Sequence, residues 1–177
     1  MKRLICVISI MMFAVSIHAL GSLAGKHAAK MLPQAAAHVK GFDSLNIHGI
    51  VGFYETSKGR KLEIKGEIAG LEPNQIYAVH IHEFGSCDSP EAPGGHFNPK
   101  IKDHDGNSKC PSGGRKAGEL PGITAGTTGM ATINYTSNYL RADESEYSVI
   151  DRSIVIHKYA DGKAGKPIAC GLIQAVP

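Results

Sequence analysis

The sequence lacks several features that would assign it to a common class of protein. It contains no Trp, no long helical pattern, and no apolar run of about 20 residues, the length that a bilayer-spanning helix needs. Neither sign of charge is in clear excess, since the formal net charge is +3. These absences argue against a helix-rich fold and against nucleic acid or an acidic membrane as a partner.

Glycine, in contrast, is abundant, with 21 residues in a chain of 177. The glycines occur among short apolar runs and frequent turn signals, a pattern typical of all-β proteins. The length fits one domain with a sizeable core. The composition therefore predicts a single all-β domain.

The N-terminus has the form of an export signal. A basic start precedes an apolar run over residues 4–17, about the length of a secretory h-region, and small residues follow it. We predict a signal peptide over residues 1–24, cleaved after Ala24 or, alternatively, after Ala19; an uncleaved membrane anchor is the other interpretation. Cleavage leaves 17 basic against 16 acidic residues. The mature protein is expected to be periplasmic or secreted, with no stable membrane association.

Residues 25–34 have no periodic pattern and are interpreted as a flexible leader, which leaves residues 35–177 as the domain. Apolar and polar residues alternate over 45–54 and again over 61–68, and the short polar segment between them predicts a hairpin. Further strands are predicted over 75–83, 130–135, 153–159 and 168–176.

The stretch over residues 84–127 has no periodic pattern and is rich in Gly, Pro, Asp, Asn and Ser. A loop of this length in a compact domain is normally functional. The predicted fold is a Greek-key β-sandwich or flattened barrel with one long, ordered loop.

Four histidines are the candidate metal ligands. His80 and His82 lie two residues apart on a predicted strand, so both rings face the same side. Such a pair alone is weak evidence for a metal site, because two histidines on a solvated strand face are the ordinary explanation for the pattern. His96 follows two glycines near the start of the long loop, and His157 ends an apolar strand. Four imidazoles are a typical ligand set for copper, so the sequence predicts a metal site.

The motifs around these histidines resemble those of the Cu,Zn superoxide dismutase family, in order and over residues 36–177. Within the family, this sequence resembles the bacterial exported type, and some of its features are similar to those of copper-only members. The motifs that carry the resemblance are Ala78-Val79-His80-Ile81-His82-Glu83-Phe84-Gly85 with Cys87, Gly95-His96-Phe97-Asn98-Pro99, Ile156-His157 with Asp161, and Ala169-Cys170-Gly171-Leu172-Ile173.

The resemblance implies a role for each of these residues. Copper would be bound by His80, His82, His96 and His157. His96 would also be catalytic and would bridge copper to zinc. Cys87 and Cys170 would form a disulfide, with two free thiols as the alternative. Asp161 would link the metal-binding histidines through hydrogen bonds, unless Asp161-Gly162 is an ordinary turn.

The zinc side departs from the family pattern. His104 matches one zinc ligand, but Lys116 and Glu119 stand where the family has histidine and aspartate. Glu can bind zinc and a protonated Lys cannot. The remaining zinc ligands are then His96, His104 and Glu119. Cys110 is a candidate fourth ligand, with a free thiol or an intermolecular disulfide as the alternatives.

The substrate-guiding arginine of the family is also missing, because its position is occupied by Pro167. Lys163 or Lys166 is a candidate replacement, although both are equally interpretable as solvated charges. The pair Arg115-Lys116 is a further basic cluster.

The predicted function is superoxide dismutation, with superoxide as the substrate and a copper ion as the cofactor, while zinc binding stays open. The alternative is a non-enzymatic protein that binds or delivers copper on the same fold. A structural β-sandwich with incidental histidines is the third interpretation. Homodimer formation is possible, but no stretch of sequence identifies a contact surface.

Overall fold

The computed structural model describes residues 32–56, 61–99, 115–160 and 163–177. His104, Cys110 and Asp161 lie outside these residues. No helix in the described part of the chain is long and apolar enough to cross a membrane. Residues 31–177 form one compact unit.

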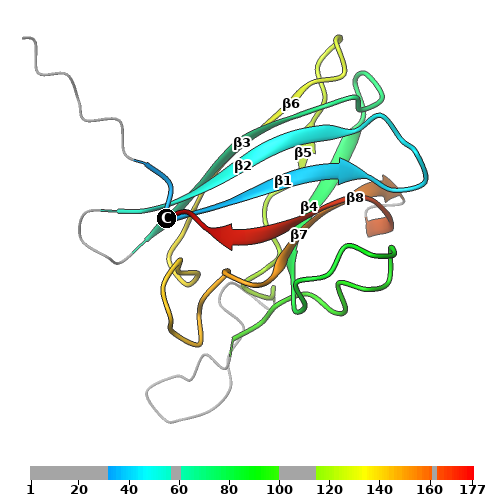
Figure 1. Cartoon of the computed structure of the whole chain (residues 1–177). Coiled ribbons are helices and arrows are strands. Elements are labelled where there is room, and N and C mark those ends of the chain that lie inside the picture. Colours follow the sequence, from blue (N-terminus) through cyan, green and yellow to red (C-terminus); the bar gives the residue numbers. More distant parts are fainter. Residues whose placement is uncertain (1–31, 57–60, 100–114, 161–162) are drawn as a thin grey trace, which may run out of the picture. The chain divides into compact units, whose positions relative to one another are not determined.

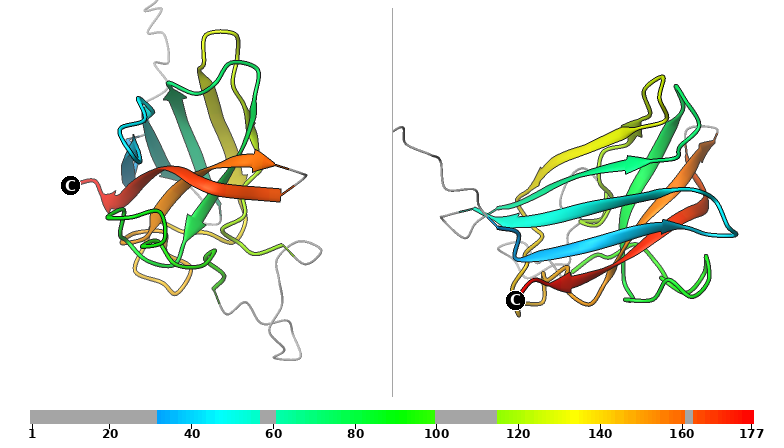
Figure 2. Two further views of the ribbon diagram at one scale, coloured as in Figure 1. Left: turned by 90° about the vertical axis from the view of Figure 1, so that its right-hand side faces the viewer. Right: turned by 45° about the horizontal axis from the view of Figure 1, so that its top comes forward.

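The fold is all-β, as predicted, and consists of a single sheet of eight antiparallel strands (Figure 1). Their order in the sheet is β5-β4-β7-β8-β1-β2-β3-β6. β5 and β6, at the two ends of this order, contact each other, and the sheet curls into a nearly closed barrel (Figure 2). The strands are β1 (Ala35–Gly41), β2 (His48–Glu55), β3 (Leu62–Ala69), β4 (Ile76–His82), β5 (Ile123–Thr124), β6 (Ala131–Ser137), β7 (Ser153–Ala160) and β8 (Lys163–Ala175).

Alternating side chains build the core inside the barrel. Phe53, Ile64 and Ile154 come from three different strands and are completely buried. Burying one such side chain contributes about 1.5–3 kcal/mol to folding. β4 differs from its neighbours because six of its seven residues are buried. Segments of the long loop pair with the edge of β4 that faces away from β7, as in the hydrogen bond from Phe97 N to the carbonyl of Ile81 at 2.9 Å. His80 and His82 of β4 are buried.

The predicted β2–β3 hairpin and strands β4, β6 and β7 are confirmed. β1 was not predicted, and neither was the two-residue strand β5 inside the long loop. β8 also begins at Lys163, five residues before its predicted start, so the segment between His157 and Ile168 pairs as a β7–β8 hairpin instead of forming a loop. Gln34, the last residue of the expected leader, bonds through its backbone to Phe53 and Val176.

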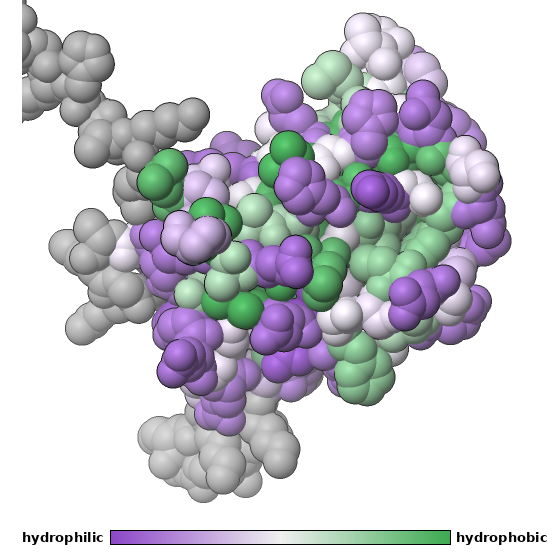
Figure 3. Space-filling model, in the orientation of Figure 1, coloured by the Kyte–Doolittle hydropathy of each residue, from purple (hydrophilic) through white to green (hydrophobic). Residues whose placement is uncertain are grey.

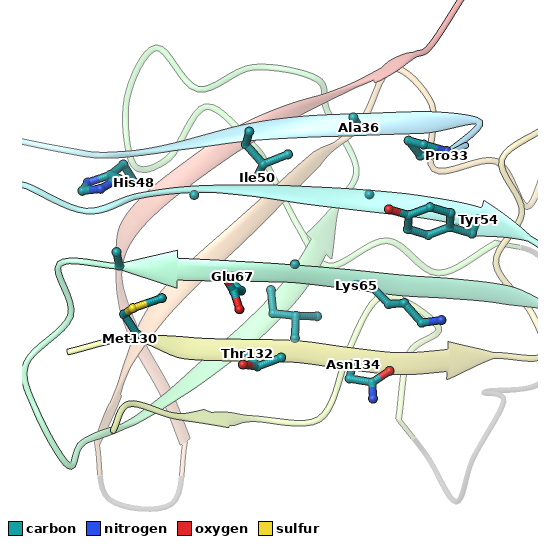
Figure 4. Close-up of a pocket in the computed structure, with 15 residues that line it drawn as sticks. Pro33, Ala36, His48, Ile50, Tyr54, Lys65, Glu67, Met130, Thr132 and Asn134 are labelled. Carbon is teal, nitrogen blue, oxygen red and sulfur yellow. The ribbon is translucent and has the colours of Figure 1, made fainter. Parts of the chain in front are cut away.

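The outer face of β1, β2, β3 and β6 carries a hollow of about 780 Å³, which His48 lines and none of His80, His82, His96 and His157 does (Figure 4). Ile50 and Met130 are exposed at its walls, with Lys65 and Glu67 beside them. Hydrophobic residues lie among hydrophilic ones on the face that carries these strands (Figure 3).

Candidate metal centre

Four histidine rings meet where β4, β7 and the long loop come together. His80 and His82 lie on β4, and His157 lies beside them because β7 pairs with β4. His96 reaches the same place because the loop runs along β4, with an isolated bridge between His82 and His96. One ring nitrogen from each histidine lies within 4.8 Å of the others. The structure therefore brings together all four predicted copper ligands.

Hydrogen bonds to main-chain carbonyls set the orientation of two rings. The Nδ1 atom of His82 lies 2.9 Å from the carbonyl oxygen of Gly94, and Nδ1 of His157 lies 3.0 Å from that of Gly165. A carbonyl only accepts, so each Nδ1 carries the proton and each Nε2 keeps a free lone pair. The two Nε2 atoms are 3.1 Å apart. Lone pairs at that distance repel unless a proton or a cation lies between them.

His80, the other histidine of β4, offers Nδ1 to a metal, whereas His82 and His157 offer Nε2. Nδ1 of His80 is buried and has no hydrogen-bond partner. A buried polar atom without a partner costs about 1–3 kcal/mol, which a metal ion at this point would offset. The donor set of one Nδ1 and several Nε2 lone pairs consists only of imidazoles, and imidazole suits copper. The residues therefore fit a copper ion.

Burial keeps these rings neutral and ready to bind a metal. Burial, together with the neighbouring histidines, lowers the pKa of His80 to about 3 and the pKa of His82 to about 4. Burial also lowers the pKa of His157. A neutral ring at pH 7 has a lone pair to donate, whereas a protonated ring does not.

The fourth ring is held by a carboxylate. Nδ1 of His96 lies 2.9 Å from Oε1 of Glu119. Glu119 is fixed in turn because its segment runs along β4, where Ile81 N donates to the carbonyl of Gly118 at 2.8 Å. A Cβ atom at Gly118 would collide with the carbonyl oxygen of Ile81, so only glycine allows this close approach.

Lys116, which stands where the family has a zinc-binding histidine, contacts Glu119 through its backbone amide at 3.3 Å. No ion pair joins its ammonium group to a described carboxylate. Of the predicted zinc ligands, the structure therefore brings His96 and Glu119 into direct contact, while His104 and Cys110 lie outside the described residues, as does Asp161.

The predicted disulfide between Cys87 and Cys170 is confirmed, and it joins the long loop to β8 across 83 positions of sequence. Pro167 pairs with His157 across the β7–β8 hairpin, so the family position for a guiding arginine lies beside the site and holds no charge. Lys166 is engaged elsewhere, with its ammonium 3.3 Å from Asp43.

Three contributions to the site were not predicted. The carbonyls of Gly94 and Gly165 gave no sequence signal, because every residue has a carbonyl. Gly94 itself has a φ of +75°, which favours glycine, and its position is set by the turn before His96. Arg152 stacks on the ring of Phe97 at 3.5 Å and donates to the carbonyl of Glu83 at 2.8 Å, and so joins the segment after His96 to the end of β4.

A cavity of about 400 Å³ opens beside His80 and His96. Its other walls include Arg115, Glu119 and Tyr159. This cavity gives a small molecule access to the histidine cluster from one side.

An all-imidazole cluster on a curled antiparallel sheet, with a disulfide that ties the covering loop to the barrel, defines a class of copper-binding β-barrel. Residues 47–173 match the family model of copper/zinc superoxide dismutase. The chain therefore belongs to the copper/zinc superoxide dismutase family, and superoxide dismutation is its activity.

Relatives agree with this assignment at modest identity. The extracellular Cu-Zn superoxide dismutase of Onchocerca volvulus is 30% identical over 145 residues, which cover 72% of this chain and 69% of that protein. A Cu-Zn superoxide dismutase of Arabidopsis thaliana is 30% identical over 142 residues, with coverage of 72% and 83%. The crystal structure of the clock protein EA4 matches with a TM-score of 0.67 and 26% identity, over 85% of this chain and 99% of that chain.

Proposed function

We propose that copper binds to Nδ1 of His80 and to Nε2 of His82, His96 and His157. The support is the hydrogen bonding of the rings: Nδ1 of His82, His96 and His157 each has an acceptor, which leaves their Nε2 atoms for a metal. Nδ1 of His80 is buried without a hydrogen-bond partner. When bound, copper supplies one-electron chemistry, alternating between Cu(II) and Cu(I) as one superoxide becomes dioxygen and a second becomes hydrogen peroxide. The reaction consumes two protons, and the protein has to deliver them.

His96 is the proton carrier in this proposal. About 27% of its side chain is exposed, whereas the other three histidines are buried. Its Nδ1–H donates to Glu119, so its Nε2 is the atom that would hold either copper or a proton. Whenever Nε2 does not hold the metal, it can take a proton from water and pass it to the reduced substrate. The carboxylate of Glu119 stabilises the positive ring while the proton is held, and it keeps the ring from turning.

Glu119 also leads to a proposal about zinc. Its contact of 2.9 Å occupies the nitrogen through which His96 would bridge to a second metal. We therefore propose a dismutase that works with copper alone, in which the hydrogen bond from Glu119 does the orienting. A zinc site made by His96, His104 and Glu119 is the competing assignment, and it requires this hydrogen bond to open.

Export is part of the same proposal. Residues 1–24 would be the signal peptide and 25–34 a leader, and the mature protein would act in the periplasm or outside the cell. The extracellular name of the Onchocerca volvulus relative and the Cys87–Cys170 disulfide both support this, because disulfides persist in oxidising compartments.

The test is superoxide decay catalysed by the protein loaded with one copper and freed of zinc. We expect fast catalytic decay that the His157→Ala variant loses, and no increase when zinc is added. A Glu119→Gln variant, which keeps a hydrogen-bond acceptor but removes the charge, should retain copper and decay superoxide more slowly. If decay is fast only after zinc is added, the copper-only proposal is wrong. Decay no faster than that of His157→Ala under either condition would favour copper delivery.

A further inference from the structure

The charge around the cavity sets a problem for the proposed substrate. Superoxide is an anion, and an anion enters a narrow site readily only when the walls attract it. The carboxylate of Glu119 lines the same cavity as His80 and His96 and repels such a substrate.

Three described cations that lie close in sequence to His157 are directed away from the cavity. Lys158, next to His157, has its ammonium 3.5 Å from Glu72, and Lys166 reaches Asp43. Arg152 stacks on Phe97. Position 167 is a proline, although it lies opposite His157 in the hairpin. None of these four residues lines the cavity.

Among the described residues, Arg115 is the cation that lines the cavity. The residue is exposed, and no ion pair joins its guanidinium to a carboxylate in the described part of the chain. Its backbone is held close to the site from the next residues onward, because Lys116 N donates to Glu119 and Ala117 N donates to the side chain of Asn98 at 3.3 Å. The guanidinium thus extends from an anchored segment at the mouth of the cavity.

We propose that Arg115 is the residue that attracts the anionic substrate to the histidine cluster and offsets the charge of Glu119. This inference rests on the proposed function for the identity of the anion. The electrostatic role itself applies to any small anion that approaches the bound metal. Arg115 is a positioning residue here, since it acts by raising the local concentration of the anion and not by moving protons or electrons.

The experiment compares four copper-loaded proteins: wild type, Arg115→Gln, Arg115→Lys and Arg115→Glu. Lys65→Gln is the matched control, because it removes the same charge from the outer face of β3, beside the hollow shown in Figure 4. Two quantities are measured at several ionic strengths. One is the second-order rate of superoxide decay, and the other is the dissociation constant of azide from the visible absorption of the copper(II) protein.

We expect Arg115→Gln to lower the superoxide rate and to weaken azide binding by about three- to tenfold at low salt, within the range that attractive fields supply. Arg115→Glu should lower both further, and Arg115→Lys should restore most of the loss. The dependence of both quantities on salt should become flatter in Arg115→Gln, because screening acts on the charge that was removed. Lys65→Gln should stay within about twofold of wild type. Copper content and thermal midpoint, measured alongside, should not change.

The outcomes separate this inference from the function on which it rests. If wild type decays superoxide rapidly and Arg115→Gln matches it in rate, azide affinity and salt dependence, the role of Arg115 is wrong and the dismutase stands. If wild type shows no catalysis but azide binding still weakens in Arg115→Gln and recovers in Arg115→Lys, the proposed function fails and the anion-attracting role stands. Equal losses in Arg115→Gln and Lys65→Gln would overturn the inference by showing that only the net charge matters.

Discussion

Removal of the Cys87–Cys170 disulfide should destabilise the protein strongly. The bond closes a loop of 83 positions. In the chain-entropy model, a loop of this size restricts the unfolded state by about 4.5 kcal/mol at 25 °C. Domains of this size have total stabilities of about 5–15 kcal/mol, so the bond is a large share of the whole.

The assay is urea denaturation of the metal-free protein, with the Cys87→Ser/Cys170→Ser variant compared against wild type. The chain has no Trp, so the transition is followed by far-UV circular dichroism or tyrosine fluorescence. With a slope of about 1–3 kcal/mol per M, a loss of about 4.5 kcal/mol lowers the midpoint by about 1.5–4.5 M. Wild type with its disulfide reduced serves as the control and should match the variant.

Loss of the disulfide should change copper binding less than it changes the free energy of unfolding. The covering loop stays attached to β4 by backbone hydrogen bonds such as that from Phe97 N to the carbonyl of Ile81 at 2.9 Å. Just past the end of β4, Glu83 N donates to the carbonyl of Gly95 at 2.9 Å. The variant should therefore still bind copper when folded. A midpoint shift worth less than about 1 kcal/mol would refute the entropic reasoning. Complete loss of copper binding by a folded variant would show that the disulfide itself positions the loop.

Three further predictions follow from the site and its support. The metal-free protein should lose stability as the pH falls from about 6.5 to 4, because the β4 histidines have lowered pKa values when folded and the unfolded chain takes up their protons first. The free energies of unfolding from urea denaturation at pH 7 and pH 5 should differ by on the order of 2 kcal/mol per ring, and equal values would contradict this. Arg152→Ala should cost about 1–3 kcal/mol by the same assay through loss of the Phe97 stack and of the charged hydrogen bond to the carbonyl of Glu83, with Arg152→Lys intermediate, whereas an unchanged midpoint would mean that solvent replaces both contacts. Gly118→Ala should push its segment off β4 and lower the copper content of the purified protein, while Gly126→Ala, where a Cβ meets only an ordinary contact at 3.7 Å, should bind copper normally; equal copper content in the two would contradict the close-packing argument.

The sequence predicted the local part of the site well. The two-residue spacing of His80 and His82 requires only the alternation of a strand, and the structure confirms it. The meeting of His80 with His157 depends on the pairing of β4 with β7, whose residues lie more than 70 positions apart. No periodic pattern encodes that pairing, so it was predicted only through the family resemblance.

β1 shows why some of the fold was missed. Its first three residues are alanines, which have weak strand propensity. The strand forms because β2 and β8 provide hydrogen-bonding edges on its two sides, and because small side chains at Ala35 and Ala37 fit the crowded interior. Glu119 was predicted as a zinc ligand from its place in the motif. Its direct bond to His96 depends on the course of the loop over β4, which composition and spacing do not determine.

The way the rings are held has a consequence for genetic robustness. The acceptors that orient His82 and His157 are main-chain carbonyls, which every amino acid possesses, so no single codon change can delete them outright. The acceptor for His96 is a side chain, and one missense change at Glu119 removes it. Among the groups that orient the rings, the one at position 119 is therefore the most open to loss by substitution, and natural drift in metal requirement has its easiest route there.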